Sequence, residues 1–149
     1  MRRIVNYRKI LGVNESAELK ELKTVYRNLM KDWHPDKFQD NHDQRLDAEE
    51  KSKKIIEAYH FLVSVAPETR TQTFAEYTET TTYSTIVDFE YKAEELQISF
   101  SDGSVYEYYG VPKAIYVKLV NAETPGRFAR RHIYHSYVYR STGKMVAAV

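Results

Sequence analysis

An apolar stripe at helical spacing, ended by a proline, is the feature that most constrains the fold. Apolar side chains recur every three or four residues from Leu19 to Trp33, which is the period of one helix face. Basic residues recur at the same spacing on the outer face: Lys20, Lys23, Arg27 and Lys31. Pro35 ends the helix, because the residue before a proline is pushed out of the α region. This part of the chain must therefore bury its stripe against another helix.

A second helix is predicted from about Leu46 to Val63, with these apolar residues on one face: Ile55, Tyr59 and Leu62. The polar residues 38–43 before it suit an exposed loop. A shorter helix that ends at Gly12 leads the chain, and Asn14–Ser16 resemble a cap for the basic helix. Two long helices joined by a polar loop pack as an antiparallel pair. Residues 1–66 are therefore predicted to form a small antiparallel helical unit.

Eight threonines crowd into the stretch between Pro67 and Thr85. Threonine at this density disfavours a helix, because its branched side chain is stiff and competes for backbone hydrogen bonds. The stretch is therefore predicted to be a linker or the first strand of a second unit. We accordingly divide the chain into a first domain of residues 1–70 and a second domain of residues 71–149.

The second half shows the alternation of a half-buried strand, with these apolar residues two apart: Leu96, Ile98 and Phe100. Asp102-Gly103 is a hairpin-turn signal, since glycine adopts positive φ without steric cost. Strands are predicted over 86–110 and a helix over 112–122, with Pro112 in its first turn. Pro125-Gly126 is expected to close that helix. The second domain is therefore predicted to be a small antiparallel sheet with a helix, of the α+β class.

The composition excludes several classes of function. A net charge of +1 gives no overall positive potential that would attract nucleic acid or a membrane surface. The absence of cysteine removes disulfides, thiol catalysis and cysteine-bound metal. No stretch approaches the roughly 18 apolar residues of a membrane span, and the basic start lacks the apolar run of a signal peptide. We expect a cytoplasmic protein without a membrane partner.

His34-Pro35-Asp36, directly after the basic helix, is the motif with the clearest chemistry. Pro35 stiffens the turn, Asp36 can accept from an arginine of a partner, and His34 can donate or accept. A compact polar turn beside a cationic stripe suits docking on an acidic protein surface. The alternative is that the histidine is an ordinary turn residue, the stripe is a solvated face and the tripeptide arose by chance.

Three segments resemble the J-domain family in order and spacing: Tyr7–Val13, Tyr26–Lys37 and Ile55–Leu62. The resemblance covers about residues 5–65. It implies a co-chaperone module that recruits a DnaK-type heat-shock ATPase and stimulates its ATP hydrolysis, while hydrolysing nothing itself and needing no cofactor. It also implies the following docking residues: Lys23, Tyr26, Arg27, His34, Pro35, Asp36 and Lys37.

The chain departs from the J-domain pattern at several places. Asn28 and Asp32 stand where family members often carry further basic residues, which weakens the cationic stripe. Ser52 occupies a position usually held by phenylalanine, which puts a core or docking contact in doubt. The Gly/Phe-rich stretch and the cysteine-rich zinc module of full-length DnaJ proteins are absent, and no fourth helix is evident.

A second resemblance covers about residues 82–140. Asp102–Pro112, followed by Tyr116, Leu119, Asn121–Gly126 and Phe128, resembles the KTSC domain, which is named for its occurrence at the carboxy terminus of some lysyl-tRNA synthetases. The central Tyr-x-Tyr of that family corresponds to Tyr106 and Tyr108. The function of the family is not established, and RNA binding has been suggested from context.

Local charge bears on the suggestion of RNA binding. Residues 71–124 hold nine acids against three lysines, a net of −6, whereas residues 125–149 hold five basic residues and no acid, a net of +5. These basic residues are interleaved with aromatic ones, a pattern that can follow a phosphate backbone and stack bases; the aromatic residues are Phe128, Tyr134, Tyr137 and Tyr139. The candidates for nucleic-acid binding are Tyr106, Tyr108, Arg127, Arg130 and Arg131. Alternatively, the alternating tyrosines of the basic segment pack as strand residues, half in the core and half on the surface, and the basic segment pairs with the acidic one.

No catalytic or metal-binding pattern emerges. His132 and His135 lack a third ligand at the expected spacing, and Ser141–Lys144 lacks the glycine-rich loop of a phosphate site. His34 and Asp36 have no nucleophile beside them. We therefore expect a non-enzymatic interaction protein that docks a DnaK-type ATPase, with the second domain targeting a client, a ribonucleoprotein or a site. The alternative is an RNA-binding protein that uses the KTSC-like domain, with the helical half as scaffold. The sequence leaves the client and the oligomeric state open.

Overall fold

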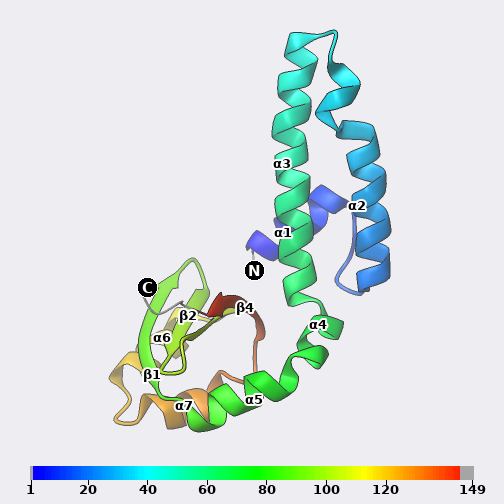
Figure 1. Ribbon diagram of the computed structural model, residues 1–149. Helices are drawn as coiled ribbons and strands as arrows, with labels where there is room; N and C mark the ends of the chain where they lie inside the picture. The colour runs from blue at the N-terminus through cyan, green and yellow to red at the C-terminus, as the bar shows by residue number, and fades with distance from the viewer. Residues whose placement is uncertain (1, 145–149) are drawn as a thin grey trace. The chain divides into compact units, whose positions relative to one another are not determined.

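The computed structural model describes residues 2–144 and divides the chain into two compact units (Figure 1). One unit comprises Arg2–Thr69 and the other begins at Arg70. The first is helical, and the second is a four-stranded antiparallel sheet with helices. The fold class predicted from the sequence, a helical unit followed by an α+β unit, is confirmed.

The helical unit is built on two long helices that pack side by side. Their bounds, with those of the two shorter elements, are α1 (Arg2–Leu11), α2 (Leu19–Trp33), the 3₁₀ helix η1 (Pro35–Phe38) and α3 (His42–Val65). Helices α2 and α3 run antiparallel in Figure 1, and α1 contacts α3. Gly12, at a φ of 69°, follows α1 as predicted.

The core of the helical unit is largely aliphatic. Its buried side chains come from α1, α2 and α3 and include Ile4, Leu11, Leu22, Ile55, Ala58, Phe61, Leu62 and Val65. The stripe predicted on α2 faces this core, with Leu22 buried and the other apolar residues partly buried. The four basic residues of the outer face are all exposed. Apolar burial along one helix face thus fixes which residues of α2 remain on the surface.

Two local details differ from the sequence prediction. The predicted loop over 38–43 is shorter, because η1 includes Phe38 and the side chain of Asn41 caps α3 by accepting a hydrogen bond from the Gln44 N–H (3.1 Å). Asn14 does not cap α2; its Oδ1 instead accepts from the Ser16 N–H (2.9 Å). Helix α2 begins later, at Leu19, whose N–H donates to the Glu68 carboxylate (2.7 Å).

The threonine-rich stretch is helical, so the prediction of a linker or strand is wrong. It forms α4 (Pro67–Gln72) and α5 (Phe74–Tyr83), and α4 supplies a helix after α3 where none was expected. The Thr81 hydroxyl donates back to the Tyr77 carbonyl (2.9 Å), and the Thr80 hydroxyl donates to Asp102 (2.7 Å). Tyr77 itself is fully buried. Tertiary contacts of α5 therefore outweigh the low helix propensity of threonine.

The sheet has the strand order β1-β2-β3-β4. Its strands are β1 (Ile86–Lys92), β2 (Glu95–Phe100), β3 (Ser104–Tyr109) and β4 (Val138–Lys144). The strands predicted over 86–110 are confirmed, as is the turn at Gly103, whose φ is 87°. The predicted helix over 112–122 corresponds to α6 (Lys113–Asn121). Pro125-Gly126 does not close that helix but begins α7 (Pro125–His132), because proline suits a first helical turn.

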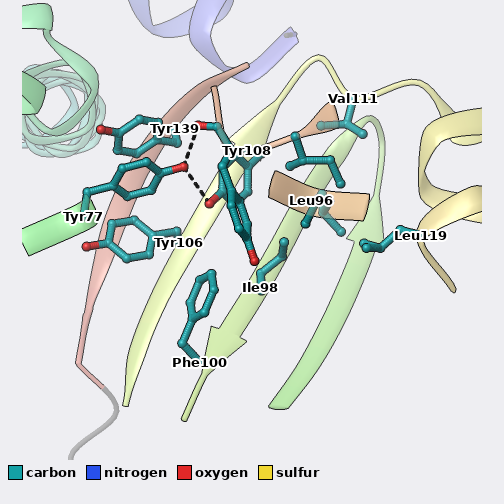
Figure 2. Packing of buried hydrophobic residues seen from close by; sticks show 12 residues of the cluster. Tyr77, Leu96, Ile98, Phe100, Tyr106, Tyr108, Val111, Leu119 and Tyr139 are labelled. Atoms are coloured by element: carbon teal, nitrogen blue, oxygen red, sulfur yellow. Dashed lines mark hydrogen bonds between the residues drawn. The ribbon is translucent and has the colours of Figure 1, made fainter. Parts of the chain in front are cut away.

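Tyrosines dominate the core of the sheet unit. The Tyr77 ring, from α5, stacks on Tyr139 (centroids 3.9 Å apart) and meets Tyr106 edge-on (5.0 Å), as Figure 2 shows. The Tyr77 hydroxyl donates to the Tyr134 carbonyl (2.7 Å) and is hydrogen-bonded to the Tyr108 hydroxyl (3.0 Å). This tyrosine cluster (Tyr77, Tyr106, Tyr108, Tyr134 and Tyr139) ties α5 to the sheet.

Among the described residues, no helix is long and apolar enough to cross a membrane.

Candidate functional site

The His-Pro-Asp motif forms the turn at the end of α2. His34 is extended (φ −63°, ψ 132°), as the residue before a proline must be, and its N–H donates to the Met30 carbonyl (2.9 Å). Pro35 starts η1, and the Lys37 N–H donates to the His34 carbonyl (3.0 Å). The backbone of the motif is therefore fixed at both ends.

The side chains of His34 and Asp36 contact each other and remain open to solvent. His34 Nδ1 accepts a hydrogen bond from the Asp36 N–H (3.2 Å) and lies 3.5 Å from the Asp36 carboxylate. The two side chains are 51% and 77% exposed. Because Nδ1 accepts, the neutral imidazole carries its proton on Nε2, which can donate to a partner. The turn thus presents one donor and one carboxylate in a fixed arrangement.

The turn is anchored on α3 by residues that flank the motif. The Trp33 and Phe38 rings stack with centroids 6.3 Å apart, and Lys51 Nζ lies 3.7 Å from the centroid of the Trp33 ring. A cation this close to an aromatic face is attracted by the ring electrons. Sequence reasoning missed Lys51, since only the packing of α3 against η1 brings it to Trp33.

The basic stripe of α2 leads up to this turn. The stripe consists of Lys20, Lys23, Arg27 and Lys31. All four side chains are exposed, and none of them forms an ion pair with another residue between 2 and 144. Asn28 and Asp32, which depart from the J-domain pattern, are also exposed. The structure therefore places Lys23, Arg27 and the motif on the surface of one helix and the turn that ends it.

Tyr26 differs from the other predicted docking residues because it is partly buried. Its ring stacks on Tyr59 of α3, with centroids 4.1 Å apart and an interplanar angle of 13°. One face of the ring therefore holds α2 against α3, and only the remaining surface can meet a partner. Ser52 is buried, with its hydroxyl donating to the Glu49 carbonyl (3.1 Å), so this departure falls in the packing of α3.

The second unit does not offer Tyr106 and Tyr108 to a nucleic acid. Both rings are buried in the tyrosine cluster, so neither has a face on which a base can stack. Burial raises the pKa of Tyr106 to about 12 and raises the pKa of Tyr108 well above its ordinary value. These two candidates are therefore core residues, and the prediction that they form a binding surface does not fit their burial.

The basic residues of the second unit fall into two groups. Arg127, Arg130 and Arg131 are exposed on α7, and none has an ion-pair partner in the described part of the chain. Arg140 on β4, in contrast, pairs with Glu107 on β3 (3.2 Å). The alternative that the basic segment pairs with the acidic one therefore holds for Arg140 but not for α7.

Between residues 2 and 144, no group of three or more His, Cys, Asp or Glu side chains could hold a metal ion. His132 and His135 are both exposed.

Comparison with known proteins follows the same division of the chain. The family model of the DnaJ domain matches residues 6–72, and that of the KTSC domain matches residues 84–137. The chaperone protein DnaJ of Thermosipho africanus is 47% identical over 57 residues, which are 38% of this chain and 14% of that protein.

Two further relatives match the same part. The chaperone protein DnaJ of Thermoplasma volcanium is 47% identical over 57 residues, 38% of this chain and 15% of its own. DnaJ homolog subfamily B member 8 of Mus musculus is 44% identical over 59 residues, 40% of this chain and 25% of its own. The match thus spans a quarter or less of each relative. The chain carries a DnaJ domain in its amino-terminal half, followed by a KTSC domain.

Proposed function

We propose that the chain is a cytoplasmic co-chaperone that docks a DnaK-type heat-shock ATPase through α2 and the His-Pro-Asp turn and stimulates its ATP hydrolysis. The KTSC domain then targets a client or a site. The observation that carries the proposal is the fixed, exposed turn of His34 and Asp36 beside a basic stripe that forms no ion pair with any residue from 2 to 144. The match to the DnaJ domain supports it.

The two parts of the surface have different physical roles in this proposal. The exposed lysines and Arg27 of α2 attract an acidic face of the partner, which raises the association rate and the affinity at low salt. His34 and Asp36 form directed hydrogen bonds, because the turn holds them in one geometry. Docking and stimulation are therefore separable. The charge on α2 determines the concentration of the chain that gives half-maximal stimulation, and the turn determines the maximal stimulation of ATP hydrolysis.

The experiment is a single-turnover measurement of ATP hydrolysis by a DnaK-type ATPase with increasing amounts of the full chain. We expect Lys23→Ala and Arg27→Ala to raise the concentration for half-maximal stimulation severalfold while leaving the maximum nearly unchanged. Lys53→Ala is the matched control, since Lys53 is also exposed but lies on α3. Absence of stimulation by the wild-type chain at any concentration would contradict the proposal, as would equal effects of Lys23→Ala and Lys53→Ala.

A second candidate function is RNA binding by the KTSC domain, with the DnaJ domain as scaffold. The observation that favours it is the set of exposed arginines on α7 without an ion-pair partner among the described residues. Arginines left free on a helix surface can neutralise phosphates, and such binding weakens steeply with salt. Retention of RNA by the full chain at low salt and its release at high salt is the expected result.

A further inference from the structure

A groove of about 540 Å³ lies in the sheet unit between the start of β1 and the start of α7. Residues 82–89 line it from one side, and Thr124–Arg127 and Arg130 line it from the other. Its volume falls within the range of roughly 300–1,000 Å³ that is typical of ligand sites.

The chemistry of the groove favours an anionic ligand with planar groups. Arg127 and Arg130 line it, are exposed, and form no ion pair with any other described residue. Tyr83 also lines it and is 82% exposed, so its ring is free to stack. Among the described residues, the single acid in the lining is Asp88, whose carboxylate accepts a hydrogen bond from the Phe89 N–H (2.9 Å). Two cations against one acid leave the groove positive.

An extended peptide added to β1 fits the groove less well. Although β1 is an edge strand, its register shifts between Ile86 and Asp88, and a shift of this kind interrupts regular pairing. The Phe89 N–H also donates its hydrogen bond to the Asp88 side chain, so this donor is already used within the strand. Natural edge strands use both irregularity and charge to prevent strand addition. The ligand is therefore one bound through side chains rather than through strand pairing.

We propose that this groove binds single-stranded RNA, an inference that rests on the second candidate function above. Arg127 and Arg130 contact successive phosphates, and the Tyr83 ring stacks on a base. The hydroxyls of the lining, together with the Asp88 carboxylate, can accept from ribose 2′-hydroxyl groups, which DNA lacks. The site is thus made by α5, β1 and α7, without Tyr106 or Tyr108.

The test is fluorescence anisotropy of a short labelled oligouridylate with the full chain at several salt concentrations. We expect Tyr83→Ala to weaken binding at least about fivefold, the low end for loss of one stacked base. Arg127→Ala combined with Arg130→Ala reduces the slope of log affinity against log salt by about 1.4, since each contact with a single strand adds about 0.7. Phe74→Ala and Lys118→Ala are controls, because Phe74 and Lys118 are exposed on α5 and α6 of the same unit but do not line the groove.

Each other outcome overturns the inference in a recognisable way. No RNA binding by the wild-type chain removes the second candidate function altogether. RNA binding that Lys118→Ala weakens as much as the combined Arg127→Ala and Arg130→Ala, or that Tyr83→Ala leaves unchanged, keeps the function but rejects this site. Equal affinity for the matching DNA strand rejects the role of the 2′-hydroxyl. Displacement of the RNA by polyglutamate at equal charge concentration shows an acidic-peptide surface instead.

Discussion

The two halves of the chain use tyrosine in opposite ways. In the helical unit, Tyr26 and Tyr59 stack and are partly exposed, and the core is largely aliphatic. In the sheet unit, the tyrosines are themselves the core, and Tyr77 and Tyr108 are fully buried. The predicted docking residues His34 and Asp36, at the end of a helix, are therefore on the surface. The predicted nucleic-acid-binding residues Tyr106 and Tyr108, in a strand, are not. The difference shows that residue type indicates a binding surface only where the neighbouring packing is known.

The largest expected effect that sharpens this comparison is that the sheet unit unfolds at a lower alkaline pH than the helical unit. Burial raises the pKa of Tyr106 and of Tyr134 to about 12, whereas unfolded tyrosine ionises near pH 10. Their contribution to stability is fully present below about pH 10 and is lost as the pH rises through about 12. Hydrogen exchange after brief alkaline exposure should show loss of protection in the strands before α2 and α3. Earlier loss in the helices would contradict the comparison.

Tyr77→Ala should destabilise the sheet unit by about 3–5 kcal/mol, the usual cost of removing a buried aromatic ring. The helical unit should keep its own unfolding transition, which also tests whether residues 1–70 and 71–149 fold independently. Denaturant unfolding monitored by tryptophan fluorescence reports the helical unit through Trp33, and loss of near-ultraviolet tyrosine dichroism reports the sheet unit. Tyr83→Ala, on the same helix but exposed, is the control and should cost less than about 0.5 kcal/mol. Equal costs for the two variants would contradict the role of Tyr77.

A smaller effect is expected at the contact between α5 and the hairpin of β2 and β3. Burial alone would raise the pKa of Asp102, but hydrogen bonds from Thr80 and Ser104 outweigh it and lower that pKa below its ordinary value. The stabilisation by the ionised Asp102 carboxylate is therefore present above about pH 4, and it is lost as the pH falls through the lower pKa that Asp102 has in the folded state.

Thr80→Val removes one of these donors and should cost about 1–2 kcal/mol at neutral pH. The cost should shrink in acid, because a protonated Asp102 no longer needs the donor as strongly. Denaturant unfolding at neutral and acid pH measures it, with exposed Thr78→Val as control. A cost that does not change with pH would show that Thr80 acts through packing alone.

Sequence was most informative where local chemistry decides the structure. The stripe of α2, its end before Pro35 and the turn at Gly103 each depend on neighbours within a few residues, and each was predicted. The position of the His-Pro-Asp turn followed in the same way.

Where distant contacts decide, sequence was insufficient. The threonine-rich stretch is helical because Tyr77 and Thr80 bond to residues more than twenty positions away. Tyr106 and Tyr108 are buried in a cluster that includes Tyr77 of α5, which contacts both, and Lys51 reaches Trp33 only through the fold. The groove beside α7 likewise depends on Pro125-Gly126 beginning a helix rather than ending one. The KTSC match begins after α5, so it too omits the helix that completes the core.

The most direct test of the central proposal is to measure two quantities on one variant, His34→Gln in the full chain. Because His34 is exposed, its free energy of unfolding should stay within about 0.5 kcal/mol of the wild type. The single-turnover rate of a DnaK-type ATPase with this variant should fall to the rate without the chain, while His60→Gln, exposed on α3, should stimulate like the wild type. Stimulation by His34→Gln equal to that of the wild type would contradict the proposal.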